Sequence, residues 1–212
     1  GIGVRRAVLP PAGPVRQIMT KDELLNEMRE AGALLEGHFV LSSGRHSSAY
    51  LQCARFLMDA ERAGRASAAL ADKVSAEIGS PIDLVFSPAM GGVVIGHEMG
   101  RALKKPAIFF ERAEGSFTLR RGFEIPEGAH CLMVEDVVTT GLSSRECIAA
   151  ARDHGADVVA GCCLVNRSGG RADIGVPLVA LALVDLPTFS ADQVPEELQT
   201  IPARKPGSRN LK

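Results

Sequence analysis

The first part of the chain alternates helical and strand-like patterns of hydrophobic and polar residues. Thr20 and Glu23 form a capping box, and the apolar residues that follow at helical spacing predict a helix over 21–31. Ser-Ser-Gly-Arg turn chemistry between apolar flanks predicts a hairpin or two short strands within 39–52. An alanine-rich segment with apolar residues at every fourth position predicts a second, longer helix over 60–78.

Beyond these elements, short apolar runs alternate with helical segments. The runs span residues 84–86, 107–110, 131–134, 158–165 and 178–184. Helices are predicted from the glycine pair at 91–92 to 103, and from 141 to 153. This alternation predicts a parallel sheet that is covered on both faces. Since such sheets bind ligands at the carboxyl ends of their strands, functional residues are expected just after these runs.

Composition and charge narrow the class of protein. The 212 residues, 46% of them hydrophobic and 23% charged, fit one globular domain with a small appendage. A net charge of −1 gives no electrostatic reason to expect nucleic acid or a membrane as a partner. No apolar run approaches the ~18 residues of a membrane helix. The five cysteines lack metal spacing, which indicates reduced thiols in a core and a cytoplasmic protein: Cys53, Cys131, Cys147, Cys162 and Cys163.

The chain divides into four predicted parts. Residues 1–18 are basic, contain no acid and lack the apolar stretch of a signal peptide, so they are expected to be a disordered extension or an expression remnant. Residues 19–60 hold the first helix and the hairpin, and residues 61–190 hold the core. Residues 191–212 form a C-terminal segment whose basic, polar end, from 202 onward, is expected to fray.

The segment 134–141, Val-Glu-Asp-Val-Val-Thr-Thr-Gly, carries the most informative pattern. A loop that enters a helix presents free backbone N–H groups, threonine hydroxyls add donors, and Gly141 lets the backbone approach an anion closely. This arrangement is typical of a phosphate cradle. The carboxylates of Glu135 and Asp136 suit ribose hydroxyls or a metal bound through water. The ligand that combines these features is a ribose 5-phosphate.

This segment resembles the binding motif for 5-phosphoribosyl 1-diphosphate (PRPP) in type I phosphoribosyltransferases. The resemblance implies an α/β fold with a central, mostly parallel sheet flanked by helices and a small N-terminal hood. It also implies a pyrophosphate loop at 86–92, with unusual backbone geometry at Met90 or Gly91. The predicted PRPP-binding residues are Glu135, Asp136, Val137, Val138, Thr139, Thr140, Gly141, Leu142, Ser143, Met90, Gly91 and Gly92.

Other segments resemble the orotate phosphoribosyltransferase family. Residues 37–47 look like the hood that covers the base, and residues 166–170, Asn-Arg-Ser-Gly-Gly, look like the base-binding segment. Arginine pairs bidentately with a carboxylate, which orotate carries and which uracil and adenine lack. The residues expected to bind orotate are Thr139, Arg167, Ser42 and Tyr50.

Residues 111–123 resemble the family's mobile catalytic loop, although the segment has no lysine or histidine. A departing diphosphate develops negative charge, which nearby cations must stabilise. The resemblance therefore makes Arg112, Arg120 and Asp136 the expected catalytic residues, with Arg121 a further loop cation. Ser42 and Gly91 stand where lysines are common in the family, which indicates a shorter-loop branch.

The function implied is transfer of the phosphoribosyl group from PRPP to orotate, in pyrimidine biosynthesis. Mg²⁺ is expected to bind mainly through PRPP, without a dedicated set of protein ligands, and a homodimer is expected in which the catalytic loop is shared. Alternatives are a phosphoribosyltransferase for a purine or uracil, a PRPP-sensing regulator without activity, and a plain α/β binding module. A carboxylate-pairing role for Arg167 favours orotate over the neutral bases, and the absence of a DNA-binding arm disfavours a regulator.

Overall fold

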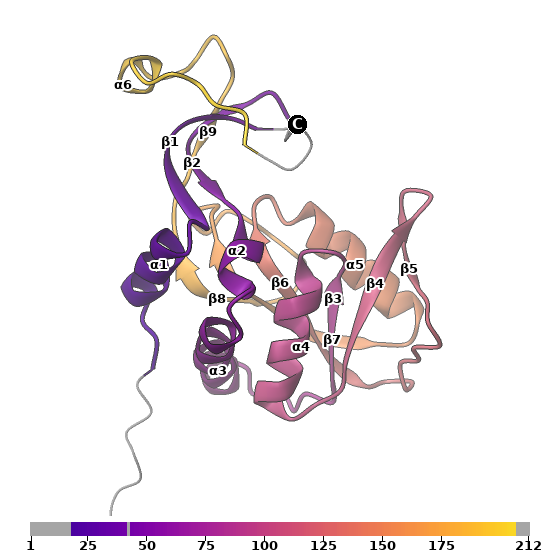
Figure 1. Cartoon of the computed structure of the whole chain (residues 1–212). Helices are drawn as coiled ribbons and strands as arrows, with labels where there is room; N and C mark the ends of the chain where they lie inside the picture. The colour runs from indigo at the N-terminus through magenta and orange to yellow at the C-terminus, as the bar shows by residue number, and fades with distance from the viewer. Residues whose placement is uncertain (1–17, 42, 207–212) are drawn as a thin grey trace, which may run out of the picture.

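The computed structural model describes residues 18–41 and 43–206, and its core is one six-stranded sheet, which is drawn in Figure 1. All neighbouring strands are parallel except β5, which runs antiparallel to β4 at one edge. The strands, in their order across the sheet, are β5 (Ser116–Leu119), β4 (Ala107–Ala113), β3 (Leu84–Pro88), β6 (His130–Val138), β7 (Asp157–Asn166) and β8 (Leu178–Leu183).

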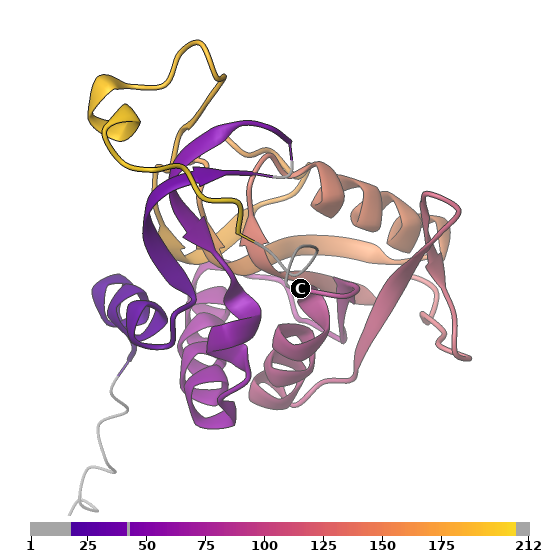
Figure 2. The same cartoon turned by 45° about the horizontal axis from the view of Figure 1, so that its top comes forward.

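Helices cover both faces of this sheet, as Figure 2 shows. One face carries α1 (Lys21–Glu30), α3 (Ala60–Glu77) and α4 (Gly92–Leu103), with the short α2 (Cys53–Leu57) beside them. The other face carries α5 (Leu142–Asp153). Side chains alternate between two cores: Val85 packs toward α3 and α4, whereas Leu84 and Phe86 pack on the side of α5. Because side chains on both faces of the sheet are buried, successive residues of each strand are apolar, which explains the continuous apolar runs in the sequence.

A second, smaller sheet forms the hood above the carboxyl ends of the core strands (Figure 1). It contains β1 (Leu34–Val40), β2 (His46–Leu51) and β9 (Thr188–Phe189) in that order. The short α6 (Glu196–Gln199) lies beyond β9 and contacts β1. The hood is therefore built from two segments that are far apart in the chain, because β9 follows the last strand of the core.

The predicted sheet, its five strands and the four long helices are confirmed, as is burial of all five cysteines. Burial raises the pKa of the Cys131 thiol to about 11. Among the described residues, no helix is both long enough and apolar enough to cross a membrane. The division into four parts remains a prediction, and residues 1–17 lie outside the described residues.

The prediction of a loop over 111–123 is wrong for residues 111–119. Strand β4 continues to Ala113, turns at Glu114 and Gly115, which both have positive φ, and returns as β5. Phe117 and Leu119 on β5 pack against the core on the side of α5. This apolar contact, together with the turn-forming glycine, makes an ordered hairpin out of a segment whose charges suggested a loop.

The expectation that the tail frays from residue 202 is also wrong for the residues described. The backbone N–H of Arg204 donates to the carbonyl of His38 at 2.9 Å, and the N–H of Val40 donates to the carbonyl of Arg204 at 2.8 Å. These bonds place Arg204 beside Phe39 as a further, single-residue strand on the edge of the hood. Backbone pairing thus holds a polar segment that has little apolar surface to bury.

Candidate active site

The site lies where β3, β6 and β7 end. Glu135 and Asp136 lie near the end of strand β6, which leads into the threonine-rich turn, and β7 ends at Asn166 and is followed by Arg167. The backbone N–H of Arg167 donates to the carbonyl of Val138 at 3.0 Å, which ties the two strand ends together. Because β3, β6 and β7 are parallel, the segments at their carboxyl ends lie close together at the same end of the sheet, as the sequence predicts.

The two acids of the motif point to opposite sides of β6. Glu135 is 8% exposed, and its Oε1 accepts a hydrogen bond from Ser144 Oγ on α5 at 3.4 Å. Burial and the neighbouring Asp136 raise the pKa of Glu135 to about 8. These two effects favour the protonated form of Glu135 relative to a solvent-exposed glutamate.

Asp136 faces the other side, toward the start of α4. Its Oδ1 accepts a hydrogen bond from the N–H of Val137 at 2.8 Å, while burial raises its pKa. A Cβ atom on Gly91 would lie only 3.2 Å from Asp136 Oδ2. The carboxylate of Asp136 thus lies directly against the loop that was predicted to hold the diphosphate.

This loop, at the N-terminus of α4, packs tightly on the strand ends. The peptide bond between Ala89 and Met90 is cis, so the predicted unusual geometry occurs immediately before Met90, while Gly91 is right-handed helical with φ of −59°. A Cβ atom on Gly92 would lie 3.1 Å from the carbonyl oxygen of Val134. Met90 is 83% exposed. The first backbone N–H groups of a helix have no partner within the helix, so those at the start of α4 are candidates for binding an anion.

The turn from β6 into α5 has the form of an anion cradle. Gly141 has φ of +84°, a left-handed conformation that favours glycine, and a Cβ atom there would lie 3.0 Å from the carbonyl oxygen of Asp173. Thr140 Oγ1 accepts a hydrogen bond from the N–H of Leu142 at 3.3 Å. The side chains of Thr139, Thr140 and Ser143 are exposed, so their hydroxyl groups are accessible to a ligand.

Beside this turn lies a cavity of about 350 Å³. Its wall combines the motif, the segment after β7 and the segment after β8, and consists of Thr139, Thr140, Arg167, Ser168, Arg171, Ala172, Leu186, Pro187 and Thr188. The cavity therefore brings together Thr139 and Arg167, two residues that the sequence assigned to the same ligand.

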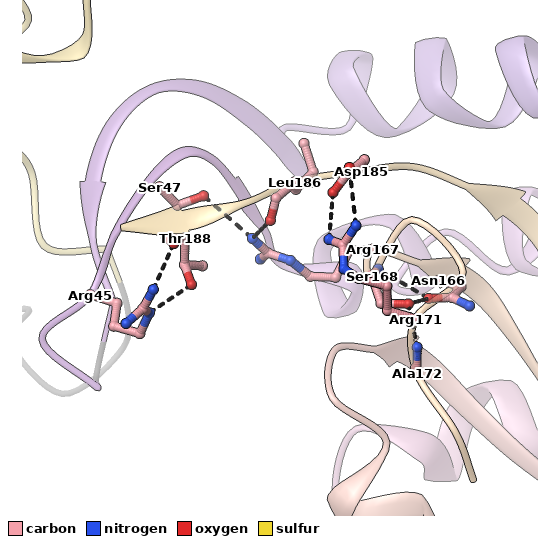
Figure 3. Close-up of polar contacts among 10 residues, drawn as sticks. All are labelled: Arg45, Ser47, Asn166, Arg167, Ser168, Arg171, Ala172, Asp185, Leu186 and Thr188. Carbon is pink, nitrogen blue, oxygen red and sulfur yellow. Dashed lines mark hydrogen bonds and ion pairs between the residues drawn. The ribbon is translucent and has the colours of Figure 1, made fainter. Parts of the chain in front are cut away.

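Arg167 is the most unusual side chain of this wall (Figure 3). It is 8% exposed, and burial lowers its pKa. Among the described residues, its guanidinium donates only to neutral oxygens, Ser47 Oγ on the hood and the carbonyl of Leu186, each at 3.3 Å. Over residues 18–41 and 43–206, no carboxylate forms a salt bridge with it. A buried cation that lacks an anionic partner is costly, and an anionic ligand would compensate it.

The predicted loop arginines occupy different environments. Arg112 forms an ion pair with Glu146 on α5 and stacks over Phe117 with its guanidinium carbon 4.2 Å from the ring centre. Arg121 forms two hydrogen bonds with Glu111, at 2.8 and 2.9 Å. Arg120 is exposed and makes no salt bridge within the described part of the chain. Arg120 is thus the loop cation that is free to meet a ligand.

Two predicted contacts to the base are not placed in the cavity wall. Tyr50 packs beside Phe39 with ring centres 6.0 Å apart, and its hydroxyl lies 3.5 Å from Gln52 Oε1. Ser42 lies outside the described residues. Both remain predictions.

Sequence reasoning missed three contributors, Ser47, Arg171 and the segment 185–188. The last follows β8 directly, so the rule that functional residues lie just after strands could have found it. Arg171 comes one residue after the recognised base-binding segment.

The fold and this site define a phosphoribosyltransferase, and the Phosphoribosyl transferase domain family matches residues 57–182. Orotate phosphoribosyltransferases of Sphingopyxis alaskensis and Erythrobacter litoralis are each 62% identical to the chain. The first aligns over 194 residues, 91% of this chain and 99% of that protein, and the second over 191 residues, 90% and 99%. The chain belongs to the orotate phosphoribosyltransferase family.

Solved structures agree with this assignment. The orotate phosphoribosyltransferase of Aeropyrum pernix is similar with a TM-score of 0.65 and 30% identity, covering 76% of this chain and 93% of that one. A Mycobacterium tuberculosis orotate phosphoribosyltransferase in complex with PRPP shares the fold, with a TM-score of 0.61 and 23% identity over 77% of this chain and 95% of that one.

Proposed function

We propose that the chain transfers the 5-phosphoribosyl group of PRPP to orotate in the cytoplasm, and that the cavity beside Thr139 holds the orotate. The products are orotidine 5′-phosphate and diphosphate, so the reaction is a step of pyrimidine biosynthesis. The observation that carries this assignment is Arg167, a buried guanidinium in the cavity wall whose hydrogen bonds within the described part of the chain go to neutral oxygens.

The carboxylate of orotate supplies the anion that Arg167 lacks. A guanidinium presents parallel N–H donors that match both oxygens of a carboxylate. Uracil and the purine bases are neutral and would leave the cation uncompensated. Thr139 lies in the same wall and offers a hydroxyl group to the ring oxygens.

PRPP fits the remaining parts of the site. The turn from Thr139 to Ser143 receives the 5-phosphate at the N-terminus of α5, and the loop from Met90 to Gly92 receives the diphosphate at the N-terminus of α4. Glu135 and Asp136 accept hydrogen bonds from the ribose hydroxyls between these two anion sites. The ribose carbon that reacts then lies between the diphosphate loop and the cavity that holds the base.

Mg²⁺ is compatible with this arrangement. Over residues 18–41 and 43–206, no group of three or more histidine, cysteine, aspartate or glutamate side chains could hold a metal ion. Asp136, whose carboxylate lies against the diphosphate loop, can assist a metal ion through water. The metal would neutralise charge on the diphosphate and would be bound mainly by PRPP itself.

Catalysis follows from positioning and from electrostatics at the leaving group. Arg167 and Thr139 hold orotate so that its ring nitrogen faces C1 of the ribose. As the bond to diphosphate breaks, Arg120, directly after β5 of the β4–β5 hairpin, stabilises the developing negative charge. Arg112 on β4 can contribute once it leaves its ion pair with Glu146. We propose a homodimer in which this hairpin serves the neighbouring subunit, because the family resemblance implies a shared loop.

The test compares bases and one matched pair of variants. The protein is mixed with PRPP, Mg²⁺ and orotate, the loss of orotate absorbance is followed, and uracil, adenine and hypoxanthine serve as alternative acceptors. Orotate alone should react. Arg167→Leu should lose orotate turnover and retain PRPP binding by calorimetry, whereas Arg152→Leu, at an exposed position on α5, should resemble the wild type. Equal turnover of a neutral base would contradict the assignment, and PRPP binding without turnover of any base would favour a regulator.

A further inference from the structure

The segment Asp185–Phe189, here named the closing segment, forms one wall of the cavity and also contributes β9 to the hood. Leu186, Pro187 and Thr188 all line the cavity. The first half of the segment is attached to the base-binding segment, since the N–H of Leu186 donates to the carbonyl of Arg167 at 3.2 Å. The position of Thr188 therefore depends on what holds the second half.

Backbone pairing alone holds this second half weakly. Strand β9 has two residues, and it pairs with β2 only through Thr188 with Ser47 and Phe189 with His46. Pro187 has no N–H and contributes no backbone donor. Two-residue pairings at a sheet edge are marginal, so a further contact is needed to fix the wall.

Arg45 provides this contact from the hood (Figure 3). Its Nε donates to Thr188 Oγ1 at 2.7 Å, and one terminal nitrogen donates to the carbonyl oxygen of Thr188, also at 2.7 Å. One guanidinium thus fixes both the backbone and the side chain of a residue in the cavity wall. Arg45 also closes the turn of the hood hairpin, because its carbonyl accepts from the N–H of Leu41 at 2.8 Å.

The same short region supports Arg167. Ser47, two residues after Arg45, accepts a hydrogen bond from the guanidinium of Arg167, and so does the carbonyl of Leu186 in the closing segment. A shift of the closing segment relative to β2 would change the distance between the two acceptors of Arg167, Ser47 Oγ and the carbonyl oxygen of Leu186. The orientation of Arg167, and with it the site for the carboxylate, therefore depends on the alignment of β2 with β9.

We propose that Arg45 is a positioning residue for base recognition: by clamping Thr188, it locks the closing segment onto the hood and holds the cavity in the shape that binds orotate. Arg45 itself is exposed and is not part of the cavity wall. The inference rests on the proposed role of the cavity. It assigns to the arginine of the Ser-Gly-Arg turn a function separate from direct contact with substrate.

The test uses graded variants at both ends of the clamp. Arg45→Ala should raise the KM for orotate roughly tenfold, as expected for loss of a bidentate, charge-assisted contact, and leave the KM for PRPP within about twofold. Arg45→Lys, which cannot reproduce the fork, should be intermediate. Thr188→Val should reproduce part of the loss, and Arg45→Ala combined with Thr188→Val should add little to Arg45→Ala alone.

A matched control is available on helix α1, which contacts β1 of the hood. Arg29 of α1 forms an exposed ion pair with Glu36 of β1 at 3.2 Å, and neither residue lines the cavity. Arg29→Ala removes a comparable arginine contact to the hood and should leave both KM values unchanged. A rise in the orotate KM of Arg29→Ala equal to that of Arg45→Ala would overturn the proposal, because any loosening of the hood would then be sufficient.

Hydrogen exchange without substrate tests the clamp independently of the reaction. In Arg45→Ala, the amides of Leu186, Thr188 and Phe189 should exchange faster than in the wild type, while those of α5 should not change. Unchanged exchange at 186–189 together with a wild-type KM for orotate would overturn the inference. If these amides exchange faster in Arg45→Ala but the wild-type protein does not turn over orotate, the clamp is supported and the proposed function is rejected.

Discussion

Asp136 lies directly against Gly91, so that the acid of the ribose-phosphate motif touches the loop assigned to the diphosphate. A Cβ atom at position 91 would lie 3.2 Å from one carboxylate oxygen of Asp136 and 3.3 Å from the other. The backbone of Gly91 has ordinary helical angles, so its lack of a side chain is needed for space and not for conformation. The two segments proposed to bind PRPP are therefore in direct contact.

Replacement of Gly91 by alanine should weaken PRPP binding without unfolding the protein. The added methyl group forces the Asp136 carboxylate to move by a few tenths of an ångström, and such overpacking typically costs about 1–3 kcal/mol. We expect the Kd for PRPP, measured by calorimetry, to rise roughly tenfold. Gly79→Ala is the control, because a Cβ atom at Gly79 meets nothing within 4 Å. Unchanged PRPP affinity in Gly91→Ala would show that the position of Asp136 is not important for binding.

Replacement of Asp136 by asparagine should impair turnover severely and leave the fold intact. The amide retains the shape of the side chain but removes the negative charge that stabilises a cation-like ribose, so kcat should fall by on the order of 10²–10³. Circular dichroism and the melting temperature should remain close to those of the wild type, because burial already disfavours the charged form of Asp136. Near-normal kcat in this variant would remove Asp136 from the catalytic residues.

The sequence predicts the parts of the site that are local in the chain. The turn from β6 into α5 and the glycine loop before α4 are continuous segments in which residue type and chain geometry are directly linked. The alternation of side chains along β6 also implies that Glu135 and Asp136 point to opposite faces of the sheet, although they are adjacent in the sequence motif. This difference in environment gives Glu135, and not Asp136, the hydroxyl of Ser144.

The contacts that complete the cavity join residues far apart in the chain, and no local pattern reports them. Arg45 and Thr188 are separated by 143 positions, and Arg167 and Ser47 by 120. Strand β9 is too short to give a period, and its two residues pair only because the hood folds back over the sheet. The β4–β5 hairpin was missed for a different reason, since its arginines and glutamates suggested a solvated loop although Phe117 and Leu119 anchor it.

The raised pKa of Glu135 predicts how stability depends on pH. The pKa rises from the model-peptide value of 4.5 to about 8 in the folded protein, so the folded state binds more protons than the unfolded state between these values. The free energy of unfolding should therefore decrease as the pH rises through this window. Chemical denaturation at several pH values should show a smaller decrease for Glu135→Gln, whose side chain cannot ionise. Identical slopes in both proteins would contradict the raised pKa.

The same group predicts a proton linked to substrate binding. Ribose hydroxyls donate to an ionised carboxylate, so PRPP binding at neutral pH should release a proton from Glu135. Calorimetry of PRPP with Mg²⁺ in buffers of different ionisation enthalpy should detect release of up to about one proton near pH 7, declining above pH 8. Glu135→Gln serves as the control that removes this contribution while retaining the proton release of the ligand itself. Equal release in both proteins would place the ionisation elsewhere.

Arg120 should be the loop cation whose loss most affects the chemical step. Arg112 is committed to Glu146 and Arg121 to Glu111, whereas Arg120 is exposed and makes no salt bridge within residues 18–41 and 43–206. Arg120→Ala should lower kcat on the order of 10²-fold with little change in the melting temperature, because the lost charge acts on the leaving diphosphate. Arg121→Ala is the matched neighbour: it removes an arginine whose charge already stabilises the ionised form of Glu111, lowering that group's pKa. Its kcat should change much less, and a larger effect from Arg121→Ala than from Arg120→Ala would reverse the assignment.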